Sequence, residues 1–221
     1  GAVLKEKESI YNTISEVLPD SGFEDNSYAK RVLVPFGEYI PFPFKFVPGL
    51  RKMVGPVGSF KKGDDINVFN IPANESDGGS VKIGPLICYE DIFPSLCLDV
   101  AREGVDLFFV TTNDAWFGEE GCAIQHAAHS VLRAVETQRP FLRCGNAGWS
   151  GWIDSNGYQR EVLKDENGSI YCARATVMNL ALSLNSQREK SFYVRNGDLF
   201  AYFCAFVSFG ACIRLTSKMN Y

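Results

Sequence analysis

An apolar stretch ends at a cysteine in the segment GPLICYED, residues 84–91, and the residues that follow are tyrosine, glutamate and aspartate. A cysteine needed only for packing would lie inside the apolar run, whereas Cys88 stands at its polar edge. A thiol at the carboxyl end of a strand is accessible, and backbone N–H groups of the next turn can support its thiolate as a nucleophile. Cys88 is therefore a candidate nucleophile, and a half-buried packing cysteine is the simpler alternative.

A lysine and a glutamate, Lys30 and Glu38 in the segment YAKRVLVPFGEY, could assist such a thiol. Because the pKa of a free thiol is about 8.5, a nucleophilic cysteine needs a base or a cation nearby. An ammonium group held by a carboxylate can also stabilise the oxyanion that forms when a thiolate attacks a carbonyl. The alternatives are a lysine in solvent before a buried strand and a glutamate that only serves a turn.

Two further candidates follow the next apolar stretch, VDLFFVTTN, at residues 105–113. Asn113 and Trp116 stand at the end of this predicted strand. Since the carboxyl ends of parallel strands meet at one edge of a sheet, we expect both side chains near Cys88, where they could contact a substrate. A capped helix start with a packed tryptophan is the alternative.

Strands and helices alternate through the middle of the chain, which is the α/β signature. The predicted elements are strands at 30–36, 81–89, 105–113, 140–146 and 168–180, helices at 93–103 and 120–138, and a hairpin at 151–163. Asn156 and Gly157 stand at the turn of that hairpin, a pair typical of tight β-turns. The hairpin after the alternating part predicts a mixed sheet.

The helix predicted over 120–138 carries an apolar stripe at helical spacing, which we expect to face the sheet. The stripe consists of Ile124, Ala127, Ala128, Val131, Leu132 and Val135. His126 lies beside it, and a structural hydrogen bond is the expected role. We expect Cys97, Cys144 and Cys172 to be core residues.

Composition excludes several classes of protein and of site. The chain has 221 residues, enough for one sizeable core, and its net charge of -4 with no basic patch argues against nucleic acid as a partner. Its seven cysteines form no C-x-x-C pair, and there are only two histidines. A zinc site is therefore not expected, and nothing in the sequence calls for a metal or another cofactor.

Two aromatic segments point to a lipid surface. Residues 39–63 hold four prolines and four glycines among aromatic and basic residues, which excludes a helix and predicts a long ordered loop. Residues 199–213 contain no charge, and a helix of this length spans roughly 22 Å, between a buried helix and a membrane span. We predict a membrane helix here, because five aromatic residues leave no polar face.

Five segments in the same order resemble the nitrilase-type domain of bacterial apolipoprotein N-acyltransferases, a branch of the nitrilase (carbon-nitrogen hydrolase) superfamily. The resemblance covers roughly residues 10–213. The segments are YAKRVLVPFGEYIPF, GPLICYEDIFP, TTNDAWFG, QHAAHSVLRAVETQRPFLRCGNAGWSGWID and SFYVRNGD.

The resemblance implies a nitrilase-like α-β-β-α sandwich, here partial because its N-terminal strands are missing, plus a C-terminal apolar helix. Residues 1–190 would be the catalytic domain, incomplete at its N-terminus. Residues 191–221 would be a transmembrane helix and a short tail. The chain would then be a C-terminal fragment of an enzyme of the bacterial inner membrane, with its catalytic domain on the extracytoplasmic side.

The resemblance also implies a reaction and roles. Cys88 matches the nucleophile and Lys30 the catalytic lysine, while Glu38, Tyr89 and Glu90 match further residues that the family needs. In the family's reaction the cysteine takes an acyl chain from a phospholipid as a thioester. The N-terminal amine of a diacylglyceryl-cysteine apolipoprotein then accepts it.

Two departures from the family's pattern bear on activity. The family's general base, a glutamate, and its bundle of membrane helices lie upstream of the residues present, so we expect this chain to be inactive alone. Two other functions stay open. One is a soluble amidase of the superfamily that hydrolyses a small amide, and the other is a non-catalytic remnant of the fold.

Overall fold

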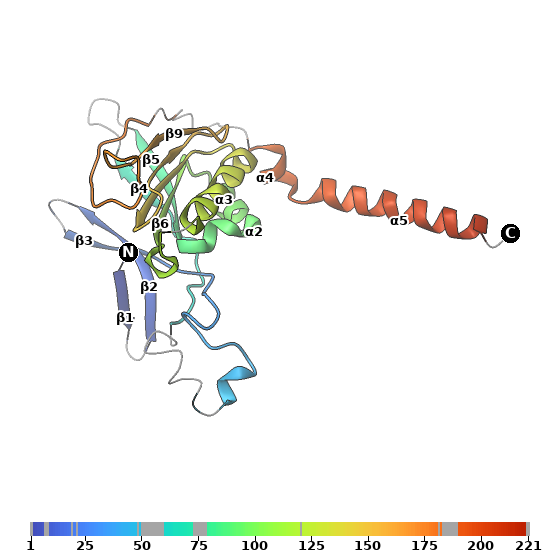
Figure 1. Ribbon diagram of the computed structural model, residues 1–221, viewed down its shortest axis with the longest axis horizontal. Helices are drawn as coiled ribbons and strands as arrows, with labels where there is room; N and C mark the ends of the chain where they lie inside the picture. The colour runs from blue at the N-terminus through green and yellow to red at the C-terminus, as the bar shows by residue number, and fades with distance from the viewer. Residues whose placement is uncertain are drawn as a thin grey trace.

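Two β-sheets of different size carry the strands of the chain (Figure 1). The computed structural model describes residues 2–6, 9–18, 20, 22–47, 49, 60–72, 79–119, 121–180, 182 and 190–219. The smaller sheet is an antiparallel meander of β1 (Ala2–Glu6), β2 (Ser9–Leu18) and β3 (Gly22–Ala29). The larger sheet consists of β4 (Phe69–Pro72), β5 (Ser80–Ile87), β6 (Leu107–Asn113), β7 (Phe141–Asn146), β8 (Gly151–Ile153) and β9 (Gln159–Val162).

The larger sheet is mixed, as predicted, and its strands follow one another in chain order. Strands β5, β6 and β7 are parallel, while β4, β8 and β9 pair antiparallel to their neighbours. The parallel strands need crossovers, which helices α2 (Pro94–Arg102) and α3 (Cys122–Thr137) supply. The register pairs Ile87 with Thr111 and Asn113 with Asn146, so three strands end at one edge of the sheet.

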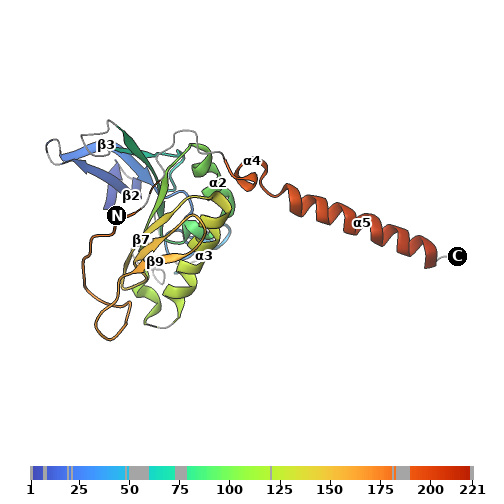
Figure 2. The ribbon, with the colours of Figure 1, turned by 90° about the horizontal axis from the view of Figure 1, so that it is seen from above.

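The two faces of the larger sheet are covered differently. Helices α2 and α3 lie on one face, over a core in which the rings of Phe108 and Phe141 stack with centroids 4.4 Å apart. The smaller sheet lies on the other face, where Ile14 and Tyr28 belong to a second apolar cluster with Ile87 (Figure 2). Among the described residues the layers are therefore helices, large sheet and small sheet.

Two predicted strands are absent from the described residues. Residues 30–36 are irregular, and the strand precedes Lys30 as β3 instead of following it. Residues 168–180 form no strand either. The segment follows a turn in which the Asp165 carboxylate accepts the Asn167 and Ser169 N–H groups, and its backbone pairs with no described strand.

Helix α3 packs with a face that overlaps only partly with the one expected, through Ala127 and Val131. Ile124, Leu132 and Val135 are each more than half exposed, and of the predicted stripe only Ala127 is fully buried. The buried face consists of Ala123, His126, Ala127, Ser130, Arg133, Ala134 and Thr137. The small residues let the helix approach the sheet, and the buried polar residues meet charged partners there. These polar contacts, and not the apolar stripe alone, decide which face of α3 is buried.

The cysteines predicted as core residues divide into three cases. Cys97 is buried on α2, as expected. Cys172 is only half-buried and Cys144 is exposed, so the prediction was wrong for both. Cys144 belongs to β7, whose side chains alternate between the two faces of the sheet, and Arg143 occupies the buried position next to it.

The described part of the aromatic loop is largely irregular, as predicted. Residues 39–47 contain a single short 3₁₀ helix, η1 (Phe44–Phe46), and residues 60–63 contain no helix. Residues 48 and 50–59 of the predicted loop lie outside the described residues.

The predicted C-terminal helix is present as α5 (Leu199–Met219), which projects from the body of the chain in Figure 1. By length and composition, Leu199–Thr216 could cross a membrane, and none of this segment is buried. A short helix before it, α4 (Phe192–Asn196), packs on α2 and α3 through the buried Val194. The Arg102 guanidinium also donates to the Val194 carbonyl at 3.1 Å. This hydrogen bond holds α4, which precedes α5, against α2.

The two sheets are joined at one buried carboxylate. Glu90 lies in a 3₁₀ helix, η2 (Cys88–Ile92), that begins where β5 ends, and its side chain is fully buried. One of its oxygens accepts the backbone N–H groups of Arg31 and Val32, at 2.7 and 3.0 Å. The other accepts the Tyr28 hydroxyl at 2.9 Å and the Ile87 N–H at 2.7 Å. Burial raises the pKa of Glu90, and these donors oppose that shift.

We expect Glu90→Gln to lower the free energy of unfolding by about 1–3 kcal/mol, because an amide has one oxygen where the carboxylate has two. If the amide oxygen of the glutamine accepts the Arg31 and Val32 N–H groups, its NH₂ group faces the buried Ile87 N–H, which then has no acceptor. Chemical denaturation of the detergent-solubilised protein measures the change. Glu161→Gln, at an exposed position of β9, is the control and should shift stability by less than about 0.5 kcal/mol. Equal stability of both variants would show that Glu90 does not join the sheets.

Candidate functional site

Cys88 is held in an unusual backbone conformation at the mouth of a cavity. It is the first residue of η2, directly after β5, and its φ of 56° lies in the left-handed region that residues with a side chain rarely adopt. The cavity has a volume of about 800 Å³, and Cys88 is half-buried in its lining. This strained turn places the thiol at the sheet edge that the sequence predicted.

The Lys30 ammonium lines the same cavity and is paired with Glu38. The lysine side chain is only 1% exposed, and Nζ lies 2.9 and 2.8 Å from the two oxygens of Glu38. Glu38 also accepts the side-chain amide of Asn12 at 3.2 Å and the Val34 N–H at 2.9 Å. A buried cation needs such a partner, and the carboxylate is itself held in place by two further donors.

Tyr89 contacts both Lys30 and the chain segment that follows it. Its hydroxyl donates to the Leu33 carbonyl at 2.5 Å, and the Lys30 ammonium lies 5.1 Å from the centre of its ring. Burial, followed by the charge of Glu38, raises the pKa of Tyr89 to about 12. The hydroxyl therefore stays protonated at neutral pH and keeps its bond to the segment that follows Lys30.

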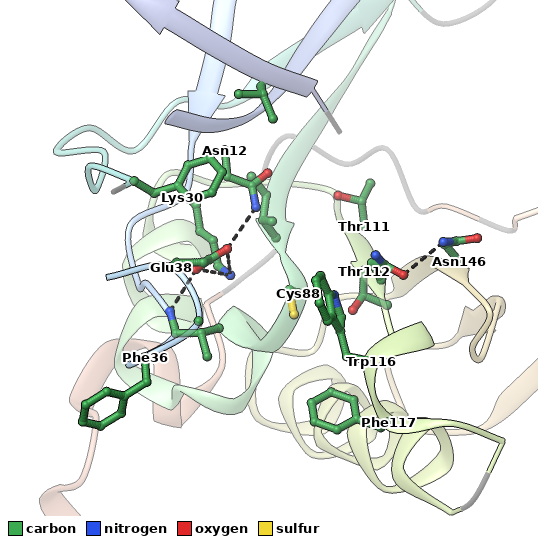
Figure 3. A pocket seen from close by; sticks show the side chains of 16 residues that line it. Asn12, Lys30, Phe36, Glu38, Cys88, Thr111, Thr112, Trp116, Phe117 and Asn146 are labelled. Carbon is green, nitrogen blue, oxygen red and sulfur yellow. Dashed lines mark hydrogen bonds and ion pairs between the residues drawn. The ribbon is translucent and has the colours of Figure 1, made fainter. Parts of the chain in front are cut away.

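The opposite wall comes from the ends of β6 and β7. Asn113 and Trp116 line the cavity there, together with Asn146. The side-chain amide of Asn146 donates to the side-chain oxygen Oδ1 of Asn113 at 3.0 Å, and that oxygen also accepts the Ala115 N–H at 3.3 Å. Trp116 is 75% exposed at the rim. Figure 3 shows Cys88 between the Lys30–Glu38 pair on one side and Trp116 with Asn146 on the other.

The structure thus brings six of the seven predicted site residues around the cavity. Lys30, Glu38, Cys88, Asn113 and Trp116 line it, Tyr89 contacts Lys30, and Glu90 lies behind it as the junction of the sheets. Their chemical roles stay predictions.

Sequence reasoning missed several lining residues. Asn146 ends the strand parallel to β6, so the argument that selected Asn113 could have selected it too. Asn12 lies on β2 in the smaller sheet, and no local signal pointed to it. Phe36, which precedes the aromatic loop, and Phe60, which belongs to it, also line the cavity. Among the described residues, no group of three or more His, Cys, Asp or Glu side chains could hold a metal ion.

The sequence matches a known protein family and several named proteins. Residues 1–178 match the carbon-nitrogen hydrolase family. The chain is 38% identical over 172 residues to an apolipoprotein N-acyltransferase of Geobacter metallireducens, covering 78% of this chain and 30% of that protein. It is 30% identical over 209 residues to apolipoprotein N-acyltransferase 1 of Treponema denticola, covering 92% of this chain and 36% of that protein. The chain therefore spans about a third of the length of these relatives.

Among solved structures, an amidase from Nesterenkonia sp. is similar, with a TM-score of 0.48 and 21% identity over 70% of this chain and 51% of that chain. The family match and the mixed α/β layers confirm the predicted nitrilase-like fold class with its apolar C-terminal helix. Because the family match covers residues 1–178 of the 221, this chain belongs to the carbon-nitrogen hydrolase family.

Proposed function

We propose that this chain carries the catalytic domain of a membrane enzyme that matures lipoproteins. It moves an acyl chain from a phospholipid, through a thioester on Cys88, to the N-terminal amine of a diacylglyceryl-cysteine apolipoprotein. The observation that carries the proposal is the strained Cys88 turn in one cavity with a buried Lys30–Glu38 pair. The names of the relatives support the choice of reaction.

In the first half-reaction, the Cys88 thiolate attacks the carbonyl carbon of a phospholipid ester. The C–S bond forms, and the carbonyl oxygen becomes an oxyanion that the Lys30 ammonium and the Tyr89 backbone N–H stabilise. Collapse of this intermediate breaks the ester C–O bond. The lysophospholipid leaves as an alcohol after taking the proton that the thiol gave up, and the acyl chain stays on Cys88 as a thioester.

In the second half-reaction, the amine of the apolipoprotein attacks the thioester carbonyl. The same cation and N–H group stabilise the second oxyanion. The C–S bond then breaks, the Cys88 thiolate leaves, and the amine loses a proton as the amide forms. Such a two-step path divides one difficult transfer into two easier ones.

Both steps need a group that accepts and returns a proton. Glu38 accepts hydrogen bonds from Lys30, Asn12 and Val34, and Glu90 accepts four donors, so the proposal uses neither carboxylate as the general base. It assigns that role to a glutamate outside residues 1–221, as the resemblance implies. The chain alone should then be inactive.

The exposed aromatic segment, residues 36–47, favours a lipid substrate over a small soluble amide. Phe42 and Phe46 are 75% and 69% exposed, and the Lys45 ammonium lies 5.6 and 5.1 Å from their ring centres. Exposed rings beside a cation suit an interface where rings enter lipid and ammonium groups meet phosphates. A soluble amidase would have no use for this segment or for α5.

The proposal places the enzyme in the bacterial plasma membrane. Helix α5 would be a membrane span, and the domain boundary near residue 190 would separate it from the catalytic layers. The catalytic domain would lie on the extracytoplasmic side, as the resemblance implies, and the segment around Phe42 would cover the thiol as a membrane-facing lid.

The acyl carrier is tested in the full-length enzyme. Incubation with phosphatidylethanolamine that carries a labelled acyl chain should give a protein adduct that neutral hydroxylamine removes. Cys88→Ser should abolish this hydroxylamine-sensitive adduct, because serine could form only an oxygen ester, which resists the treatment. Cys144→Ser, an exposed cysteine that is not part of the cavity lining, is the control and should keep the adduct. A hydroxylamine-sensitive adduct that survives Cys88→Ser would refute the assignment.

The lysine is tested by a change that keeps its charge. Lys30→Arg replaces a compact ammonium by a larger planar guanidinium, which can still pair with Glu38 but presents its charge and donors to the oxyanion in a different geometry. We expect acyl transfer to fall by about 10²-fold or more, since oxyanion stabilisation is typically worth this much. Lys164→Arg, at an exposed position, should keep wild-type activity. Wild-type turnover in Lys30→Ala would refute the proposed role of Lys30 in stabilising the oxyanion.

The lid is tested with two substrates of different solubility. Replacing Phe42, Phe44 and Phe46 together by serine should raise the phospholipid concentration needed for half-maximal rate by about tenfold or more, because each buried ring is worth about 1.5–3 kcal/mol. The rate with a small soluble ester should stay unchanged. Phe23→Ser, which alters another exposed ring, is the control. Equal effects on both substrates would argue against a lid.

A further inference from the structure

A buried polar cluster lies behind the cavity and takes no part in the reaction described above. It consists of Asp91, Asp114, His126, Ser130 and Arg143, each at most 8% exposed. None of the five lines the cavity. Burying five polar side chains is costly unless each has a partner, so the contacts within the cluster show what it holds together.

Both ring nitrogens of His126 face carboxylates. Nδ1 lies 3.0 Å from an oxygen of Asp114, and Nε2 lies 3.1 Å from an oxygen of Asp91. An ionised carboxylate only accepts hydrogen bonds, so both contacts are hydrogen bonds when both nitrogens carry a proton. A neutral ring would direct one lone pair at a carboxylate oxygen. The geometry therefore favours the imidazolium.

The charges of the cluster agree with this state. The other oxygen of Asp91 accepts hydrogen bonds from the Arg143 guanidinium and, at 2.5 Å, from the Ser130 hydroxyl. Two carboxylates and one guanidinium leave one negative charge, which an imidazolium balances. Burial lowers the pKa of His126, but the hydrogen bonds to Asp114 and Asp91 outweigh it and raise the pKa to about 9.

The two carboxylates lie on chain segments that also carry opposite walls of the cavity. Asp91 lies in η2, three residues after Cys88. Asp114 follows Asn113 and precedes the short 3₁₀ helix η3 (Ala115–Phe117) that carries Trp116. The His126 ring is thus a bridge from the nucleophile's turn to the wall formed by residues 113–117.

Asp114 is itself firmly placed. The oxygen that faces His126 also accepts the Thr112 hydroxyl at 2.9 Å, and the Asp114 N–H donates to the Asn146 carbonyl at 3.0 Å. A Cβ at Gly148 would lie 2.4 Å from its other oxygen, so glycine is required there. The Asp114 carboxylate is therefore fixed to the wall of residues 113–117, and its contact with His126 ties that wall to the ring.

We propose that His126 is a positioning residue, kept as an imidazolium, that sets the separation between the Cys88 turn and the wall of residues 113–117. This inference rests on the proposed function only because acyl transfer is one of the two activities measured in its test. The charged groups that face its ring from the elements packed on α3 are Asp91 from η2, Asp114 from the end of β6 and Arg143 from β7.

The bridge has a defined pH dependence. The folded-state pKa of about 9 lies above the ordinary value of 6.5, so the stabilisation is complete below about pH 6.5 and is lost as pH rises through about 9. Above that pH one of the two hydrogen bonds fails, and the two walls are no longer tied through the ring.

The test compares two histidines on one helix in the full-length enzyme. His126→Gln keeps a polar side chain without the positive charge, and His129→Gln is the matched control. The measurements are single-turnover acylation of Cys88 by phosphatidylethanolamine and alkylation of Cys88 by iodoacetamide, both followed by mass spectrometry. Alkylation needs the thiolate but not the opposite wall, so it separates positioning from damage to the nucleophile.

We expect His126→Gln to lower the acylation rate by about 10²-fold, the cost typical of a misplaced substrate, with alkylation within about threefold of wild type. His129→Gln should change neither. Acylation unchanged in His126→Gln, or acylation and alkylation falling together, would overturn the proposal.

A second variant covers the case in which His126→Gln does not fold. Asp114→Asn keeps an oxygen for Thr112 and His126 but removes one carboxylate, so the alkaline fall in thermal stability should move from near pH 9 to lower pH by at least about one unit. An unchanged alkaline limb would overturn the charged bridge. If the wild-type enzyme takes no acyl chain from the phospholipid, the proposed function fails, while this comparison of melting temperatures still decides the state of His126.

Discussion

The arrangement of the site depends on one buried carboxylate. Glu90 accepts two backbone N–H groups from the segment after Lys30 and one from Ile87, the last residue of β5. The hydrogen bonds therefore hold the lysine segment, which follows the smaller sheet, against the cysteine turn, which follows the larger one. A neutral or missing side chain here would leave buried N–H groups without an acceptor, and backbone groups cannot turn away to find another.

The three residues after Cys88 each fix a different part of the cavity. Tyr89 donates to the Leu33 carbonyl, Glu90 accepts from the Lys30 segment, and Asp91 binds the cluster around His126. A 3₁₀ helix has three residues per turn, so three successive side chains leave it in three directions. One short helix can then bind both walls, and Cys88 at its start, with its left-handed φ, lines the cavity.

The charges of the site are paired inside, and its apolar side chains are exposed outside. Lys30 with Glu38, and His126 with Asp91 and Asp114, form hydrogen-bonded pairs in buried positions. The rings of the aromatic segment and of α5 lie on the surface instead. This distribution agrees with the function proposed above, in which charged groups act inside the protein and the substrate has long apolar chains.

The sequence by itself determined the alternating strands and helices of the larger sheet between residues 81 and 163, and the edge of that sheet where chemistry could occur. The apolar strands, the helices between them and the polar residues at strand ends were sufficient for this, because local periodicity reports local conformation. Cys88 and Asn113 were placed correctly on that basis. Only the tertiary structure decided which groups meet across the chain. It paired Lys30 with Glu38 inside the protein, and it turned the polar face of α3 inward because Asp91 and Arg143 lie there. It also left residues 168–180 without the partner strand that a ladder requires. Counter-charges and partner strands come from distant segments, and a local pattern carries no record of them.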